Sequence, residues 1–561
     1  MSLISGSRII LMAAGMSLFG GNVWAQQPAR PATPPREGEV DNQEITIEKN
    51  RRIELPPANR IFNKIPSLKP SEEQRKVTYE FTDRPLSVGD VRLSPNALPV
   101  QTGQPEAQPV YNNYVKVGAG NYGSFFGEAF GSGQLQENIR LGGSLRQLSS
   151  SLGPVDGKNS AASETRLKLN GAYLTNQLKL TADFGFDRDV FYFYGYRRPR
   201  EVVRDTIRQR LNTTSFRLAV ENLDPENNID YSLKTGVTAL QDNYNASEIE
   251  WATNFSGSVG ITERFVALVS ADAFVGQRTD GFVINRNLFR VKPTFKYSTG
   301  LFTLTAGVNA VNETDNRSGL NRTRAFPIVD LDVVPVGNLH FFAGVNGDIV
   351  RNTLRSFLNE NRWLGPTVPL ANTQKTLDIY GGSKGEIGSG VNYEAKVSYA
   401  EYRNFYVFNN TWPDTSRFYI LYDSGNARVL TISAQLGYAY KDLFRTTLKG
   451  DVFDYGMSRL EQAWHRPRVA ATWSNSLIVN KKLFVTTDLY YLQGMQAKNF
   501  VTGRTYTLQP IWDMNLKIDY FLGKQVSAFV SLNNIFGRNY QRYLYYPQQG
   551  LNFLGGLSYT F

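Results

Sequence analysis

Hydrophobic and polar residues alternate along the chain from Tyr111 to its end, and this alternation predicts a long series of β-strands. Successive side chains of a strand point to opposite faces, so alternation separates an apolar face from a polar one. In the segment 444–452, Phe444 and Leu448 fall on one face, whereas Arg445 and Lys449 fall on the other. A soluble sandwich would keep its inward faces apolar. Charged faces in strand after strand instead predict a polar lumen with lipid outside.

Turn signals divide the alternating region into 22 segments. The predicted strands are 111–119, 123–131, 136–149, 163–175, 177–188, 212–222, 227–242, 245–261, 263–279, 285–298, 300–313, 326–336, 338–350, 373–387, 391–403, 417–440, 443–456, 468–480, 482–493, 506–522, 525–535 and 551–561. The pattern therefore predicts an all-β fold, a 22-stranded antiparallel transmembrane β-barrel over residues 111–561. Because the strand number is even, we expect both termini on the periplasmic side and the long connections on the extracellular side.

The last eleven residues, 551–561, are expected to form the strand that closes the barrel. About 9–11 tilted residues cross the hydrocarbon of a membrane. The side chains that this strand should turn to lipid are Phe553, Leu557, Tyr559 and Phe561. Such an ending predicts outer-membrane lipid and the barrel-assembly machinery as partners.

Residues 1–25 are predicted to be a secretory signal peptide. Arg8 precedes the apolar run 9–19, and Ala25 ends a small-residue cleavage site. The run is shorter than the ~18–20 apolar residues that a spanning helix needs. Export combined with a barrel places the protein in the outer membrane of a Gram-negative bacterium.

Composition fits a barrel and removes several other classes of protein. Mean hydropathy is −0.34, too polar for a helical membrane protein, while aromatic residues reach 13%. Cysteine is absent, which excludes disulfides and thiolate sites. The net charge of +11 is scattered over both signs, so nucleic-acid binding is not expected. The charges expected to face the lumen are Lys168, Lys179, Asp183, Arg445, Lys449, Asp451, Lys517 and Asp519.

Residues 26–110 form a distinct proline-rich region that precedes the predicted barrel. They hold 13 of the 25 prolines, which favours an extended periplasmic or lumenal segment. Apolar residues such as Ile53, Phe62 and Tyr79 lie among these prolines. We therefore expect this segment to obstruct the lumen or to dock a periplasmic or outer-membrane protein partner.

The final predicted hairpin carries a motif with a family resemblance. Its residues are Asn534, Ile535, Phe536 and Tyr540, followed by Tyr546-Pro547 and by the closing strand. This ending resembles the last hairpin of TonB-dependent receptors, over the range 111–561. The resemblance implies a 22-stranded barrel and a role in ligand uptake across the outer membrane.

The N-terminal part departs from that family, because no segment before Tyr111 reads as its folded plug domain. The segment Glu44, Ile45, Thr46, Ile47 and Glu48 is similar to the short box that TonB grips by strand addition, so TonB is a partner implied by resemblance alone. A structural or assembly subunit of an outer-membrane complex and a passive diffusion channel remain as alternatives.

A barrel of 22 strands needs an obstruction, because 16 to 18 strands already enclose an aqueous channel. The candidates are residues 26–110, long loops folded inward, or a separate protein. The sequence does not choose among them.

Catalytic chemistry finds little support in the sequence. The chain has only two histidines, His340 and His465, and neither stands at a recognisable spacing from a nucleophile. No enzyme activity, cofactor or metal site is therefore expected. The loop 194–210 holds six arginines. They either grip phosphate or carboxylate groups of lipopolysaccharide or of a ligand, or belong to a loop that stays solvated or folds into the lumen against acids. The aromatic runs 191–194 and 543–546 are interpreted as parts of the interfacial girdle.

Overall fold

The computed structural model describes residues 113–561, except 199–200, 225–227, 389, 411–413 and 501. The predicted signal peptide, the proline-rich segment and the box at 44–48 lie outside the described residues.

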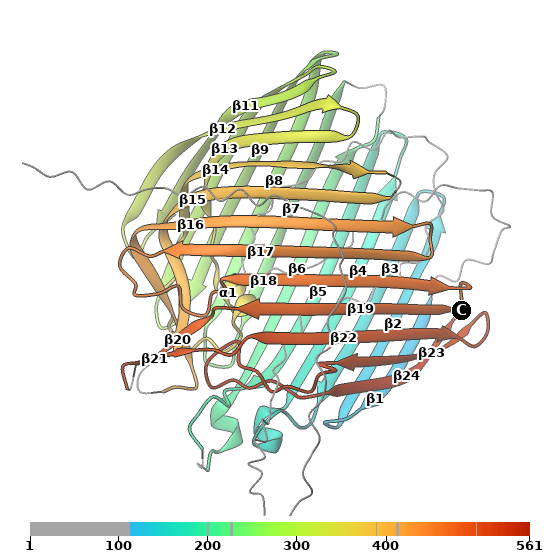
Figure 1. The fold of residues 1–561 in the computed structure, drawn as a ribbon, viewed down its shortest axis with the longest axis vertical. Coiled ribbons are helices and arrows are strands. Elements are labelled where there is room, and N and C mark those ends of the chain that lie inside the picture. The colour runs from blue at the N-terminus through green and yellow to red at the C-terminus, as the bar shows by residue number, and fades with distance from the viewer. Residues whose placement is uncertain (1–112, 199–200, 225–227, 389, 411–413, 501) are drawn as a thin grey trace, which may run out of the picture. The chain divides into compact units, whose positions relative to one another are not determined.

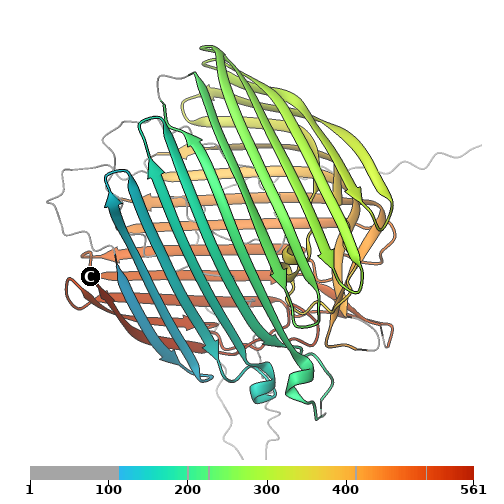
Figure 2. The ribbon, with the colours of Figure 1, turned by 180° about the vertical axis from the view of Figure 1, so that it is seen from behind.

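The described chain forms one closed antiparallel barrel of 22 strands (Figures 1 and 2). The first strands are β1 (Tyr114–Gly120), β2 (Ser124–Gln136), β3 (Ile139–Ser150), β4 (Ala162–Leu174), β5 (Leu178–Tyr192), β6 (Arg208–Asn222), β7 (Ile229–Gln241), β8 (Ser247–Thr262), β9 (Phe265–Thr279), β10 (Val283–Ser298) and β11 (Phe302–Asp315). The remaining strands are β12 (Leu320–Val336), β13 (Leu339–Val350), β14 (Thr373–Ile387), β15 (Val391–Asn410), β16 (Phe418–Tyr440), β17 (Phe444–Gly456), β18 (Val469–Val479), β19 (Leu483–Gln493), β22 (Ile511–Phe521), β23 (Val526–Asn533) and β24 (Asn552–Thr560).

Pairing between the first and last strands closes the sheet. β24 lies between β23 and β1, with Tyr114 opposite Thr560 and Gly120 opposite Leu554 (Figure 1). Close approach favours glycine here, because a Cβ on Gly556 would stand 2.0 Å from the carbonyl oxygen of Val117. The sequence-based prediction of an all-β, closed 22-stranded barrel is confirmed.

Several strands are longer than the alternation predicts. β15 runs to Asn410 rather than to residue 403, because a bulge between Arg403 and Phe405 shifts its register. Asn404 takes a φ of 54° at this bulge, and the inserted residue changes which side chains share a face. β12 begins at Leu320 rather than at 326, through a polar stretch that lacks an apolar alternation.

The two ends of the barrel differ in their connections. At one end, termed the turn end, connections are short, such as 337–338 between β12 and β13, and Phe561 lies there beside Asn113. At the opposite end, termed the loop end, the connections are mostly longer and carry the remaining elements. These are α1 (Leu354–Glu360), the 3₁₀ turns η1 (Gly157–Ser160) and η2 (Arg204–Ile207), and the hairpin of β20 (Gln496–Asn499) and β21 (Arg504–Thr507).

The helix α1 lies between opposite walls of the barrel in both views (Figures 1 and 2). Among the residues that the structure describes, no helix is long and apolar enough to cross a lipid bilayer.

Alternate residues of the strands expose apolar side chains. On β22, Trp512 and Tyr520 are exposed, whereas Asp513 and Asn515 on the other face are buried. On β17, Leu448 and Val452 are exposed in the same way. An exposed apolar band of this extent suits contact with lipid rather than with water.

Candidate functional site

Three long connections meet at the loop end, and together we call them the lid. They are 193–207 between β5 and β6, 351–372 between β13 and β14, and 534–551 between β23 and β24. Strands β7–β12 separate the first connection from the second along the wall, and β1–β4 separate the third from the first. Contacts among these connections therefore require them to reach across the mouth of the barrel.

Aromatic rings join the three connections of the lid. Trp363 stacks on Tyr546 with ring centroids 4.1 Å apart, and Tyr194 lies 4.8 Å from Tyr546 and 6.0 Å from Trp363. The Tyr194 hydroxyl also donates to the carbonyl of Pro547 at 3.1 Å. All three rings are at most 6% exposed and belong to the largest buried cluster of the described residues. Burial of large aromatic rings contributes most of the stability of such contacts. The three connections of the lid therefore form one packed layer.

A buried ion pair lies under this aromatic layer. Glu360, at the end of α1, contacts Arg466 at 2.9 Å and accepts a hydrogen bond from the Tyr406 hydroxyl at 2.7 Å. Burial is the largest influence and lowers the pKa of Arg466, but Glu360 together with Tyr406 and Tyr455 outweighs burial, and the pKa of the guanidinium rises above its ordinary value. Removal of either partner would leave an unpaired buried charge.

His465 lies beside this pair and contacts two different segments. Its Nδ1 is 2.8 Å from the carbonyl oxygen of Phe408, and its Nε2 accepts from the backbone N–H of Leu544 at 3.2 Å. An Nδ1 that donates and an Nε2 that accepts define a neutral imidazole. Burial lowers the pKa of His465 to about 4, which keeps the ring neutral at pH 7. The ring therefore links β15 to the lid as a neutral group.

The helix α1 is anchored to the barrel wall through its N-terminus. The Glu248 carboxylate at the start of β8 accepts from the backbone N–H groups of Leu354 at 2.7 Å and Arg355 at 3.2 Å. Thr353 adds a capping box with Ser356. A carboxylate at a helix N-terminus satisfies unpaired donors and opposes the positive end of the helix dipole. The lid is therefore tied to the wall by polar contacts as well as by ring packing.

The penultimate-strand motif folds the third connection of the lid. Asn534 is fully buried, and its side-chain amide donates to the carbonyls of Arg538 at 2.8 Å and Gln549 at 2.9 Å, which joins the two ends of the connection. Tyr540 is buried and donates to Asp513 at 2.7 Å. Ile535 pairs through its backbone with Met514, and Phe536 is exposed.

The closing strand β24 turns its large side chains outward. Phe553, Leu557, Tyr559 and Phe561 are all exposed, whereas Ser558 on the other face is buried. The Phe561 backbone exchanges hydrogen bonds with Asn113.

The predicted lumen charges form several separate clusters. Lys517 and Lys116 both contact Asp519 at 2.9 Å, on the face of β22 opposite to Tyr520. Lys449 lies 3.8 Å from Asp451, which also accepts from Ser433. Lys179 pairs with Glu221, Arg445 is half-buried, and Lys168 and Asp183 on neighbouring strands are exposed. Their assignment to the lumen stays a prediction.

The interpretation of the aromatic runs as girdle is wrong. Phe191 to Tyr194 are buried, as are Tyr543 and Tyr546, and all of these residues belong to one cluster across the mouth. Both runs lie beside long connections that fold inward, so their rings pack on each other instead of on lipid. The alternation of the strands does not indicate in which direction a loop folds. The available signal for inward folding was the clustering of aromatic residues beside long connections.

The remaining polar residues singled out in the sequence are His340 and the arginines between β5 and β6. His340 contacts Asp332 at 2.8 Å, and Lys384 contacts the same carboxylate at 3.0 Å. Arg197, Arg198 and Arg204 in the arginine-rich connection are exposed. Within the described residues, no group of three or more His, Asp or Glu side chains is placed to hold a metal ion.

Comparison with solved structures shows that transport receptors share the fold of this barrel. The FrpB iron transporter of Neisseria meningitidis superposes with a TM-score of 0.65 at 10% identity, over 81% of this chain and 82% of that chain. The described chain has the barrel fold of the TonB-dependent receptors. The ferric-catecholate import receptor Fiu of E. coli superposes with a TM-score of 0.62 at 10% identity, over 82% of both chains. FpvA of P. aeruginosa, solved with bound pyoverdines, gives 0.61 at 12% identity, over 81% of this chain and 72% of that chain.

Sequence comparisons add no closer relationship. No protein-family model matches the chain, and no curated protein sequence matches it. The similarity between this chain and the receptors therefore concerns the barrel fold.

Proposed function

We propose that this protein is an outer-membrane barrel for ligand uptake, with the loop end at the cell surface and the lid as the cover of its passage. The observation that carries the proposal is the meeting of Tyr194, Trp363 and Tyr546 across the mouth of a 22-stranded barrel. A barrel of this width needs an obstruction. The fold shared with iron and siderophore receptors supports uptake as the role of the passage.

The packed lid argues against a passive diffusion channel, because an open channel requires a mouth that solutes enter without moving buried groups. Uptake instead requires the lid to open when a ligand or a partner supplies the free energy. Energy coupling through TonB would depend on the segment 44–48. This coupling stays a prediction from the sequence.

The experiment measures entry of a large glycopeptide antibiotic into cells that make the full-length protein. The variant Trp363→Ala with Tyr546→Ala removes two buried rings of the lid, each worth about 3–5 kcal/mol of packing. We expect this variant to sensitise cells and the wild-type protein to leave them resistant. The control is Trp473→Ala, which removes an exposed ring from the barrel wall.

Assembly of each variant is checked by heat-modifiable migration on a gel. Resistance in cells that hold a normally assembled lid variant would contradict a passage through the lumen. That result would favour a structural or assembly role for the barrel.

A further inference from the structure

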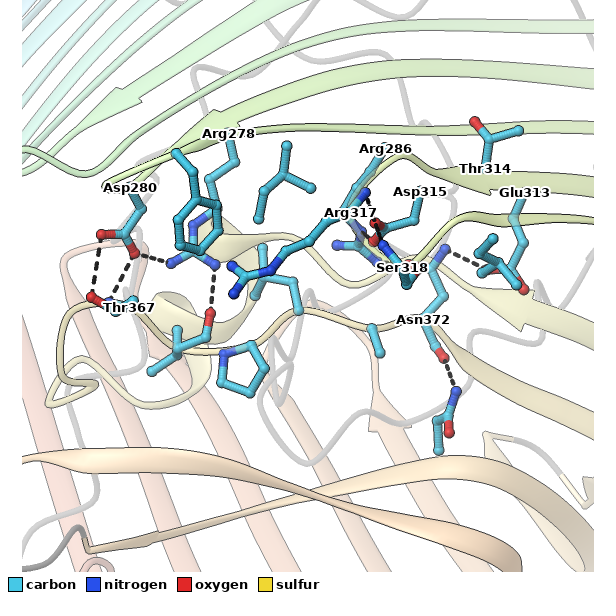
Figure 3. Close-up of a pocket in the computed structure, with 18 of the residues that line it drawn as sticks. Arg278, Asp280, Arg286, Glu313, Thr314, Asp315, Arg317, Ser318, Thr367 and Asn372 are labelled. Carbon is cyan, nitrogen blue, oxygen red and sulfur yellow. Dashed lines mark hydrogen bonds and ion pairs between the residues drawn. The ribbon is translucent and has the colours of Figure 1, made fainter.

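A cavity of about 520 Å³ opens at the loop end, beside the lid (Figure 3). The connection between β9 and β10, the connection between β11 and β12, and the stretch 367–372 of the lid line it. Its charged lining residues are Arg278, Arg286, Arg317, Arg322, Asp280, Glu313 and Asp315. Four guanidinium groups therefore share one cavity with three carboxylates.

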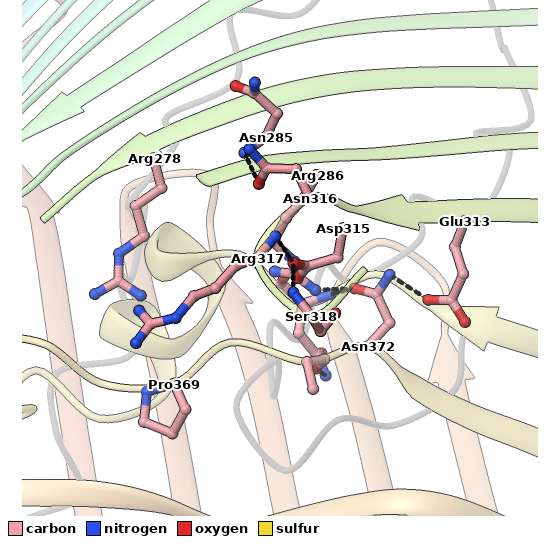
Figure 4. A network of polar contacts seen from close by, with 12 residues as sticks. Arg278, Asn285, Arg286, Glu313, Asp315, Asn316, Arg317, Ser318, Pro369 and Asn372 are labelled. Atoms are coloured by element: carbon pink, nitrogen blue, oxygen red, sulfur yellow. Dashed lines mark hydrogen bonds and ion pairs between the residues drawn. The ribbon is translucent and has the colours of Figure 1, made fainter. Parts of the chain in front are cut away.

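Three of the four arginines have a carboxylate partner. Arg278 pairs with Asp280, Arg286 lies 3.2 Å from Asp315, and Arg322 donates to Glu313 at 2.6 Å. The side chain of Asn372 connects two of these pairs, because it accepts from Arg286 at 2.8 Å and donates to Glu313 at 2.9 Å (Figure 4). The pairs Arg286–Asp315 and Arg322–Glu313 thus form one connected network, and Arg278–Asp280 is a separate pair.

Arg317 is the fourth arginine, and it forms no ion pair with any residue in the described part of the chain. Its guanidinium lies over the ring of Phe282, 3.5 Å from the ring centroid. Figures 3 and 4 show its side chain extending toward Arg278. Arg278 itself is 4% exposed, and its Nε has no hydrogen-bond partner among the described residues. Asp280 offsets the charge of Arg278, so Arg317 leaves the cavity lining with one uncompensated positive charge, which an anion would neutralise.

The wall behind Arg278 is held rigidly. Arg278 donates to the carbonyl of Val368 at 2.6 Å, and Asp280 accepts from the backbone N–H of Thr367 at 2.8 Å. Thr367 takes a φ of 60°, which is unusual for a β-branched residue and persists only where neighbours enforce it. This side of the cavity is therefore held in place by contacts between the end of β9 and the lid.

We propose that this cavity binds a phosphate or carboxylate group attached to an apolar body. Arg317 supplies a planar fork geometry that matches such oxyanions, and the Nε–H of Arg278 is a further donor without a partner among the described residues. Phe282, Leu320 and Pro369 supply apolar lining for the rest of the ligand. The proposal rests on the proposed function, because that function places the loop end at the cell surface. A free organic anion and a phosphate of lipopolysaccharide share this chemistry.

The test is calorimetric titration of the purified full-length protein in detergent with phenyl phosphate. Benzyl alcohol is the neutral probe that shares the ring and lacks the anion. We expect phenyl phosphate to bind and benzyl alcohol to bind at least about tenfold more weakly, because charge-assisted hydrogen bonds are lost. Arg317→Gln should weaken phenyl phosphate by about tenfold or more, and Arg317→Lys should restore part of the affinity.

The matched control is Arg459→Gln, at another exposed arginine of the loop end, whose backbone N–H bonds Asp423. This variant should bind phenyl phosphate as the wild type does. Equal affinity of the wild type and Arg317→Gln, or equal affinity for the two probes, would overturn the proposal.

Lipopolysaccharide added to the same titration separates the two sources of the anion. Displacement of phenyl phosphate assigns the cavity to a lipid phosphate, and its absence assigns the cavity to a free organic anion. Antibiotic entry through the lid does not involve Arg317, so a failure of binding and a failure of the passage give different results.

Discussion

Replacement of Glu360 by glutamine should loosen the lid. The change keeps the shape of the side chain and a carbonyl oxygen that accepts from Tyr406, but it removes the charge 2.9 Å from Arg466. Arg466 is 6% exposed, so its charge would remain buried without a counter-ion. Removal of one partner of a buried pair costs about 3–5 kcal/mol. The closed lid should lose free energy of that order.

Hydrogen exchange of the lid amides measures this loss. The backbone N–H of Asn361 donates to Phe357 at 2.7 Å, and that of Gly365 donates to Phe418 at 2.8 Å, so both should be protected while the lid is closed. A loss of about 3 kcal/mol or more should accelerate their exchange by at least about 100-fold. Amides of β7, in the barrel wall, should exchange as in the wild type.

Two further variants separate charge from shape. Glu201→Gln makes the same chemical change at an exposed position of the lid and should leave exchange unaltered. Adding Arg466→Met to Glu360→Gln removes the orphaned charge and should slow exchange again, because no unpaired ion then remains. Wild-type exchange in Glu360→Gln would refute the reasoning that this pair holds the lid closed.

Three further predictions concern acid, assembly and the two faces of the wall. The pKa of His465 is about 4 in the closed lid and about 6.5 when exposed, so the open lid binds the proton more readily and closure should weaken by up to about 3 kcal/mol as pH falls from 6.5 toward 4. Protection factors of the lid amides, which correct for the pH dependence of the intrinsic exchange rate, should fall over this window, and constant protection factors would exclude this role. Phe561→Asp should block assembly, since the closing strand turns this side chain outward, and wild-type amounts of heat-modifiable barrel would contradict it. A lipophilic thiol reagent should label a cysteine at position 448 in preference to one at 449, and the reverse preference would overturn the assigned faces.

The strands were predictable because alternation is a local property of the sequence. Segment 373–387 was predicted with the bounds that β14 has in the structure. β15 was cut short at 403 because the bulge at Asn404 shifts the phase of alternation, and a single residue with positive φ leaves no apolar signal. The local pattern of alternation therefore predicts which segments form strands and which face each side chain takes, as long as the backbone keeps its regular pleating.

The lid and the cavity were not predictable in the same way. Tyr194, Trp363 and Tyr546 stand far apart in the sequence, and each belongs to a connection without alternation. Their contact depends on the circumference of the closed barrel and on the length of each connection. Arg317 and Arg278 likewise line one cavity only because β9–β12 are neighbours in the wall. Non-local contacts of loops require the three-dimensional frame that the strands build.

Single-channel conductance in a planar bilayer tests most directly whether the lid closes the mouth. The full-length protein, a variant without residues 26–110 and the variant Trp363→Ala with Tyr546→Ala would be compared. We expect no steady conductance from the first two proteins and steady openings from the third. A steady pore in the full-length protein, or one that appears when 26–110 is removed from a barrel with an intact lid, would contradict this expectation.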